Sequence, residues 1–354
     1  MRYICIMKRS IILFALVVGA FASALGCTSM IVGGSHTPDG RPLLWKHRDT
    51  GASNNFLARV EPRDGRHGYV GLFNGGDSLL AEAWMGMNDA GFAIMNTASY
   101  NLAPDTARFK DQEGAVMSLA LQQCATVDDF ERLLAELPKP MGVQANFGVI
   151  DARGGAAYFE TDDMAWTRFD VADSPSGALI RSNYSVSGDE GEGMGYIRYN
   201  TAEHLIAEPL RVCAVTPLTL TEDLSRSFYH SLMGRDMYDD DFVVNQDFIP
   251  RDISTSSIVI QGVAPGADPA DTRMWAALGY PPCTAAQWAS LTEIPTDFLP
   301  DSTWESPACR EAMELRVSLF PFKGGSAKRY IDMRRLRPIS ERRHVQALKN
   351  YFSR

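Results

Sequence analysis

The chain has 354 residues, of which 45% are hydrophobic and 22% charged, enough for one large domain or two small ones with a real core. A formal net charge of −9 argues against a dedicated nucleic-acid-binding protein, and six cysteines are too few for a small disulfide-stapled scaffold. An aromatic content of 10% excludes disordered and collagen-like classes.

The first 26 residues have the pattern of an export signal. Basic residues precede an uncharged apolar run over 11–21, which is shorter than the roughly 20 residues that a membrane span needs. Ala24 and Gly26 stand three and one residues before Cys27, where signal cleavage favours small side chains. We therefore predict a signal peptide over 1–26, export to the periplasm or the extracellular space, and no integral membrane span after its removal.

Cleavage before Cys27 would make this cysteine the N-terminal residue, which allows two fates. The thiol could carry a lipid anchor on an outer surface, or it could act as a nucleophile with its own α-amine as base. The two exclude each other, because a thioether-linked lipid removes the thiolate. A lipoprotein signal prefers leucine three residues before the cysteine, but here Leu25 comes one place too late.

The mature chain begins with a predicted β-hairpin. A β-type run over 28–34 is followed by the turn signal Asp39-Gly40, and 43–45 reads as the returning strand. Antiparallel pairing around this turn would bring Asp49 back towards Cys27.

Two helices and further strands follow in blocks. Apolar spacing from Glu113 predicts a helix, and Thr126 with Asp129 forms a capping box for a second helix over 127–137. Further predicted elements are strands at 92–97, 145–150, 156–160, 166–171, 178–182 and 255–262, a helix at 198–206, and a loop-rich stretch over 265–300. Strand blocks that enclose helix blocks predict one α+β domain with a layered core over 27–324.

The last 30 residues, 325–354, hold nine basic and two acidic side chains. The simplest interpretation is a basic tail packed on an acidic body, since several apolar residues in the tail could bury one face. A tail that binds anionic lipid or glycan is the alternative. In an oxidising compartment Cys283 and Cys309, or Cys124 and Cys213, could form disulfides.

An N-terminal cysteine can catalyse acyl transfer by itself. An ordinary thiol has a pKa near 8.5 and an α-amine one of about 7.7–8.0, so the amine can take the thiol proton. The site also needs positive charge, an orienting carboxylate and oxyanion donors. Lys46 and Arg48 are candidates for the charge and Asp49 for the carboxylate, while Asn96 and Asn183 lie at the ends of predicted strands.

Several short motifs occur in an order typical of one family. They are CTSMIVG at 27–33, KHRD at 46–49, GMNDAGF at 86–92, NFGVID at 146–151 and RSNY at 181–184. Together they resemble the N-terminal-nucleophile (Ntn) linear amide C–N hydrolases, a group that includes penicillin V acylase, choloylglycine (bile salt) hydrolase and acid ceramidase. The similarity is greatest to the branch of isopenicillin-N acyltransferase and carcinine hydrolase, and it covers roughly residues 27–265.

The resemblance implies a four-layer αββα sandwich, the Ntn hydrolase fold. Cys27 would be both nucleophile and base, and Asp49 would orient its amine. Asn96 and Asn183 would contribute to the oxyanion hole, and Arg198 would support the site.

This chain departs from the family at two positions, at one of which Tyr184 replaces the histidine often seen after the asparagine. The family usually has Arg-x-x-Asp, whereas here Lys46 stands three residues before Asp49. Arg48 could cover the role from a neighbouring position, but neighbouring strand residues face opposite ways, so the sequence leaves open which of the two supplies the charge.

The expected activity is hydrolysis of a linear amide such as an N-acyl amino acid, a bile-salt-like conjugate or a small peptide. Acyl transfer to an amine, a secreted dipeptidase and a non-catalytic lipoprotein are the alternatives. The expected partner is a small-molecule amide substrate, without cofactor, metal or nucleic acid, and self-association into a homo-oligomer is left open.

Overall fold

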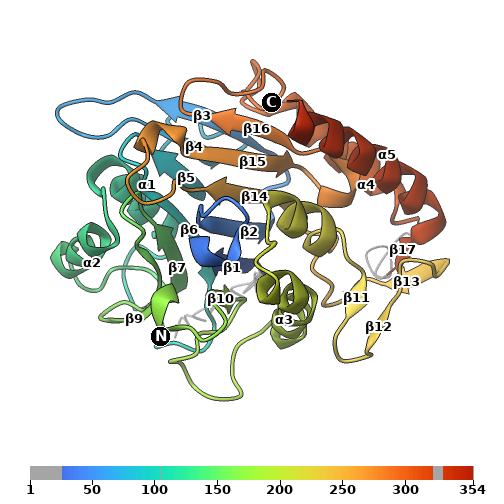
Figure 1. The fold of residues 1–354 in the computed structure, drawn as a ribbon, viewed down its shortest axis with the longest axis horizontal. Coiled ribbons are helices and arrows are strands. Elements are labelled where there is room, and N and C mark those ends of the chain that lie inside the picture. Colours follow the sequence, from blue (N-terminus) through green and yellow to red (C-terminus); the bar gives the residue numbers. More distant parts are fainter. Residues whose placement is uncertain (1–25, 105, 322–329, 354) are drawn as a thin grey trace, which may run out of the picture.

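The structure, a computed structural model, describes residues 26–104, 106–321 and 330–353. Of the predicted signal over 1–26, only Gly26 belongs to the described residues. Two stacked antiparallel sheets form the centre of the molecule, and helices cover both outer faces (Figure 1). The predicted four-layer αββα sandwich is thereby confirmed.

The first sheet, sheet A, has six strands in the order β10-β1-β2-β14-β15-β16. Their bounds are β1 Thr28–Val32, β2 Leu43–Asp49, β10 Ala178–Arg181, β14 Ser254–Gln261, β15 Arg273–Leu278 and β16 Gln287–Ser290. The predicted hairpin forms β1 and β2, and β14 lies on the other side of β2. A segment about 200 residues later in the chain therefore lies beside the N-terminal hairpin.

The second sheet, sheet B, is a seven-stranded meander from β3 to β9 in chain order. Its strands are β3 Asn55–Val60, β4 Tyr69–Asn74, β5 Met85–Asn88, β6 Ala93–Ala98, β7 Ala145–Ile150, β8 Ala156–Thr161 and β9 Trp166–Asp170. Two small ribbons, β11–β12 (Tyr229–His230 and Arg235–Asp236) and β13–β17 (Phe242–Val244 and Tyr330–Asp332), lie outside both sheets.

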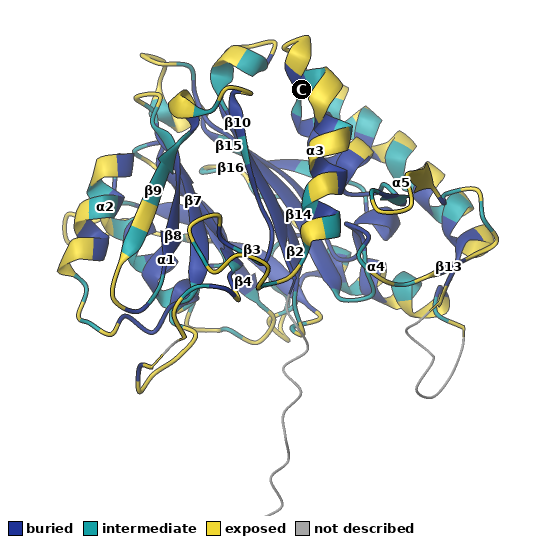
Figure 2. Cartoon of the chain, turned by 90° about the horizontal axis from the view of Figure 1, so that it is seen from below, coloured by how far each residue is buried: buried dark blue, intermediate teal, exposed yellow. Residues whose placement is uncertain are grey.

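Successive side chains along each strand point alternately into two hydrophobic layers, one on each face of the sheet, as the pleat of a strand requires. Ile31, Leu44 and Ile258 of sheet A meet Met85 and Met95 of sheet B in the layer between the sheets. The opposite faces of the strands pack under helices, so most strand residues are buried on both sides (Figure 2).

Helices α1 (Glu113–Gln123) and α2 (Val127–Glu136) cover sheet B, and the predicted capping box of α2 is present, with Thr126 accepting from the Asp129 N–H. Sheet A is covered by α3 (Tyr196–Arg211), a π-helical turn (Thr219–Leu224) and the end of α5 (Met333–Phe352). Helix α4 (Pro307–Ser318) packs at the edge of the inter-sheet core.

The basic C-terminal segment packs against the body of the protein within its described part. Arg226 donates to the main-chain oxygen and hydroxyl of Ser340 in α5, and His344 lies 2.8 Å from the Glu222 carboxylate. Ala347 belongs to the layer outside sheet A. These contacts join the C-terminal helix to the turn that precedes β11.

Three expectations need correction. The stretch 265–300 is loop-rich as expected, but it also contains two strands that the sequence analysis missed: β15 pairs with β14 throughout its length and adds β16, and the run RMWAAL of β15 lacks the alternation that marks a half-exposed strand. The helix predicted at 198–206 spans Tyr196–Arg211 and tolerates Pro209 in its last turn. The suggested disulfides are absent, since Cys124, Cys213, Cys283 and Cys309 are all free thiols.

Within the described part of the chain, no helix combines the length and the apolar composition that crossing a membrane requires.

Candidate active site

The N-terminal hairpin brings Cys27 and Asp49 together, as its turn signal predicts. Thr28 lies opposite His47 in the β1–β2 ladder, so Cys27 comes next to the end of β2. The Cys27 Sγ is 3.8 Å from the main-chain oxygen of Asp49, to which the thiol donates. Only 8% of Cys27 is exposed.

Lys46 and Arg48 lie on the same face of β2, which corrects the expectation stated for them. They are two residues apart rather than adjacent, and Leu44, two residues before Lys46, belongs to the core between the sheets. Side chains two apart on a strand share a face. Cys27 extends β1 opposite Arg48 and therefore also faces the inter-sheet space, so both cations are on the side of the thiol.

The Lys46 ammonium joins the two sheets. Its Nζ donates to Asn96 Oδ1 at 2.7 Å and to the main-chain oxygen of Trp84 at 2.9 Å. Burial lowers the pKa of Lys46 to about 7, with Cys27 acting in the opposite direction. This lysine can therefore change charge near neutral pH, which an arginine at the same position could not do.

Arg48 supplies a cation that stays charged. Its Nη2 donates to Asn74 Oδ1 at 2.7 Å, and its guanidinium lies 5.1 Å from the centre of the Trp84 ring. Burial lowers the pKa of Arg48 to about 10, while Cys27 opposes this shift. Arg48 Nη1 is buried without a hydrogen-bond partner among the described atoms.

The carboxylate of Asp49 points away from the inter-sheet space and is paired with Arg251. Its Oδ2 accepts from Arg251 Nε at 3.0 Å and from Arg251 Nη2 at 2.6 Å. Arg251 Nη2 also donates to the Gly26 oxygen at 2.9 Å. Burial alone would lower the pKa of Arg251, but the Asp49 carboxylate raises it above the ordinary value. This ion pair therefore lies directly beside the Gly26–Cys27 bond.

Arg198, in the first turn of α3, binds the main chain on the Cys27 side of the Gly26–Cys27 bond. Its Nη1 donates to the Cys27 oxygen at 2.6 Å and to Thr28 Oγ1 at 2.9 Å, and its Nη2 donates to Asn183 Oδ1 at 2.7 Å. Burial lowers the pKa of Arg198 to about 10, and Arg251 adds to the shift. Arg198 thus connects the start of β1 to Asn183.

A buried polar network holds the loop that carries Asn183. Glu160 of β8 accepts from Arg181 Nε at 2.6 Å and from the N–H groups of Val186 and Ser187 at 2.8 and 2.7 Å. The Asn183 Nδ2 donates to the Ala98 oxygen at 2.9 Å. In this structure the Asn183 amide is therefore directed at the main chain and at Arg198.

The structure places the other six predicted residues in two groups around Cys27. Lys46, Arg48 and Asn96 lie towards the inter-sheet side, and Asp49, Arg198 and Asn183 lie around the Cys27 main chain. The sequence analysis missed Arg251. Arg251 lies just before β14. Its position before a run of β-branched residues indicates a strand, but it does not indicate that this strand pairs with β2.

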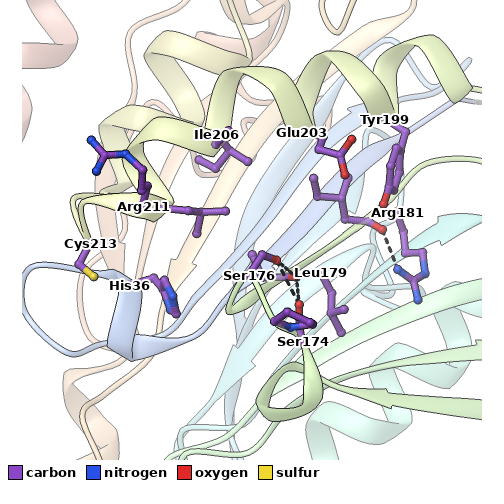
Figure 3. A pocket seen from close by; sticks show the side chains of 15 residues that line it. His36, Ser174, Ser176, Leu179, Arg181, Tyr199, Glu203, Ile206, Arg211 and Cys213 are labelled. Atoms are coloured by element: carbon purple, nitrogen blue, oxygen red, sulfur yellow. Dashed lines mark hydrogen bonds between the residues drawn. The ribbon is translucent and has the colours of Figure 1, made fainter.

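A cavity of about 500 Å³ lies between α3 and the exposed edge of β10 (Figure 3). Its walls include Leu179, Ile206 and Tyr199, and it contains none of the seven predicted residues. At the start of the β10 edge, the Ser174 hydroxyl donates to the Ala178 oxygen at 2.7 Å. Among the described residues no cluster of three or more His, Cys, Asp or Glu side chains could hold a metal ion.

Stability should depend on pH through Lys46. Between pH 7 and its ordinary pKa of 10.5, the unfolded chain binds a proton at Lys46 that the folded chain does not, so the free energy of unfolding rises with pH in this window. We expect Lys46→Met to flatten this rise. Urea unfolding between pH 7 and 10 measures it, with Lys349→Met in α5 as control. An unchanged slope in Lys46→Met would mean that the lysine is charged in the folded protein.

Comparisons with known proteins gave similar structures but no sequence match: neither a family model nor a curated protein matches the chain. An N-acylethanolamine-hydrolyzing acid amidase ortholog from Caenorhabditis elegans is 14% identical and has a TM-score of 0.44, covering 70% of this chain and 99% of its own. A variant of the conjugated bile acid hydrolase of Clostridium perfringens is 11% identical with a TM-score of 0.46, covering 76% and 93%. The penicillin V acylase of Agrobacterium tumefaciens is 13% identical with a TM-score of 0.41, covering 76% and 87%.

Proposed function

We propose that the mature chain is an exported cysteine amidase of the Ntn type, which hydrolyses a linear amide through an acyl-enzyme on Cys27. The observation that carries the proposal is the environment of this residue. Its thiol lies at the start of β1 on the same face as Lys46 and Arg48, and its main chain is bound by Arg198. The Asp49 carboxylate, which Arg251 joins to the oxygen of Gly26, would supply the orienting group that the chemistry needs.

In the proposed reaction the α-amine of Cys27 takes the thiol proton and the thiolate attacks the amide carbonyl carbon. The tetrahedral intermediate collapses when the ammonium returns its proton to the leaving nitrogen, and the C–N bond breaks. Water then attacks the thioester with the amine again as base, releasing the acid. Lys46 and Arg48 favour the thiolate, and Asn96, held by Lys46, is the candidate donor to the oxyanion.

The substrate would be an N-acyl amino acid, a bile-salt-like conjugate or a small peptide. Acyl transfer differs only in that an amine replaces water at the thioester. A lipoprotein anchored through Cys27 is opposed by burial, because a lipid on a thiol that is directed between two sheets cannot reach a membrane without unfolding the start of β1.

The first test reads the N-terminus of the exported protein by mass spectrometry. We expect a free Cys27, and incubation with a panel of acyl-amino acids, penicillin V, bile conjugates and dipeptides should produce an acyl adduct on the Cys27 peptide during turnover. Cys213, an exposed thiol in the same chain, is the internal control and should stay unacylated. A diacylglyceryl group on Cys27 would overturn the proposal.

A further inference from the structure

Two residues outside the predicted set, Ser254 and His47, contact the second oxygen of the Asp49 carboxylate. Ser254 Oγ donates to Asp49 Oδ1 at 2.6 Å, and His47 Nε2 lies 2.9 Å from Ser254 Oγ. The Arg251 N–H also donates to Ser254 Oγ, at 2.9 Å. Ser254 and His47 are fully buried.

The hydrogen atoms in this cluster can be assigned by counting. A serine hydroxyl has one proton and a carboxylate only accepts, so the proton of Ser254 lies towards Asp49. Ser254 Oγ is then the acceptor for both the Arg251 N–H and His47 Nε2, which must carry a hydrogen. The other ring nitrogen, His47 Nδ1, is buried without a partner among the described atoms.

His47 is neutral in this environment. Burial lowers its pKa to about 4, Asp49 opposes the shift, and Arg251 and Arg198 add to it. The other groups that act on this cluster are Asp247, which acts on both arginines, and Tyr280, whose own pKa burial raises. A neutral histidine of fixed tautomer is a rigid hydrogen-bond donor rather than a second charge.

A local irregularity of β14 creates the contact. Ser254 lies opposite Asp49 while Ser256 lies opposite Arg48, so the strand carries one extra residue, Thr255, between two consecutive partners on β2. Such a bulge redirects side chains at the end of a ladder. Here it places the Ser254 hydroxyl against the carboxylate, while the hydroxyl of Ser256 has no hydrogen-bond partner among the described atoms.

We propose that Ser254, itself oriented by His47, is a positioning residue that fixes the Asp49 carboxylate beside the N-terminal cysteine. The inference rests on the proposed function, in which Asp49 orients the Cys27 amine. Arg251 binds Oδ2 and Ser254 binds Oδ1, so together they hold the carboxylate plane in one rotation. Neither residue touches the substrate in this scheme.

The test compares Ser254→Ala with Ser256→Ala, two serines of the same strand of which only one binds Asp49. We expect Ser254→Ala to lower kcat on the order of 100-fold with KM unchanged, since misplacement of an orienting group costs about this much. The acid limb of its pH profile should also shift, because the amine that acts as base depends on the position of the carboxylate that orients it. Ser256→Ala should behave as the wild type.

A second pair of variants keeps the test decisive if Ser254→Ala does not fold. His47→Gln retains an N–H donor towards Ser254 and should keep most of the activity. His47→Leu removes the donor and should reproduce the lower kcat and the shifted acid limb. Equal behaviour of His47→Gln and His47→Leu, or a wild-type profile in Ser254→Ala, would overturn the proposal.

A readout without substrate separates this inference from the proposed function. Alkylation of Cys27 by iodoacetamide, followed across pH by peptide mass spectrometry, reports how readily the thiolate forms. In Ser254→Ala the pH at which the rate falls off should differ from that of the wild type, whereas alkylation of Cys213 should not change. A shift in an enzyme that cleaves none of the panel would retain the positioning role and reject the amidase; no shift would reject the role.

Discussion

Replacing Cys27 with alanine is expected to abolish amide hydrolysis without unfolding the protein. Alanine cannot form a thioester, and removal of a catalytic nucleophile lowers kcat by about 10⁴ to 10⁶-fold. Within the described part of the chain the thiol makes one hydrogen bond, the long contact with the Asp49 oxygen, and the Cys27 main chain remains bound by Arg198. The measurements are kcat/KM on the best substrate of the panel and the melting temperature.

The role of the α-amine is separated from that of the thiol by a mature chain that begins at Gly26. This chain keeps the thiol but has an amide where the base should be, so activity should fall as far as in Cys27→Ala. The fold accommodates the extra residue, because Gly26 is already bound through its oxygen by Arg251. A methyl group at position 26 would overlap Arg251 Nη2, so glycine is the residue to add.

Cys213→Ala is the control for both changes, since this exposed thiol lies at the end of α3, away from Cys27. It should remain fully active. An active chain that retains Gly26 would show that some other group accepts the thiol proton, with Lys46 the first candidate because its pKa is about 7.

Arg198→Met is expected to have the largest effect on stability. Arg198 is one of the largest fully buried side chains, and it donates to the Cys27 oxygen, Thr28 Oγ1 and Asn183 Oδ1. Methionine fills the space but removes these three hydrogen bonds. Removing one partner from a buried charged network costs about 3–5 kcal/mol. Urea unfolding at neutral pH measures the loss, and activity should fall with it because the start of β1 is released.

Arg211→Met is the matched control, because this arginine lies in the same helix but is exposed and pairs only with Glu208. Exposed pairs contribute about 0–1 kcal/mol, so its unfolding curve should nearly overlay that of the wild type. Equal stability of the two variants would mean that Arg198 does not anchor β1 to α3.

The local sequence carried much of the site. A turn signal at Asp39-Gly40 predicts that β1 and β2 pair as an antiparallel hairpin, and the register of this hairpin brings Asp49 close to Cys27. The capping box at Thr126 likewise determines where α2 begins. Both are short-range effects, in which neighbouring residues satisfy each other's hydrogen bonds, and they are therefore readable without the fold.

Three other features depended on the tertiary structure. Lys46 and Arg48 share a face because they are two residues apart on a strand, but only the packing of Leu44 in the inter-sheet core shows that this face lies between the sheets. Arg251 and Ser254 reach Asp49 because β14 pairs with β2 across about 200 residues of chain, with a bulge that no local motif encodes.

The opening residues of the chain illustrate the division. From composition and spacing alone, 1–26 reads as an export signal and Cys27 as a residue that becomes N-terminal. The environment of the Cys27 thiol is formed by strands and a helix that are distant in sequence. The reason is that buried charged groups around one atom come from all the elements that pack against it. The sequence by itself predicted the proposed nucleophile and its nearest carboxylate. The tertiary structure decided the cations, hydrogen bonds and burial that would make them reactive.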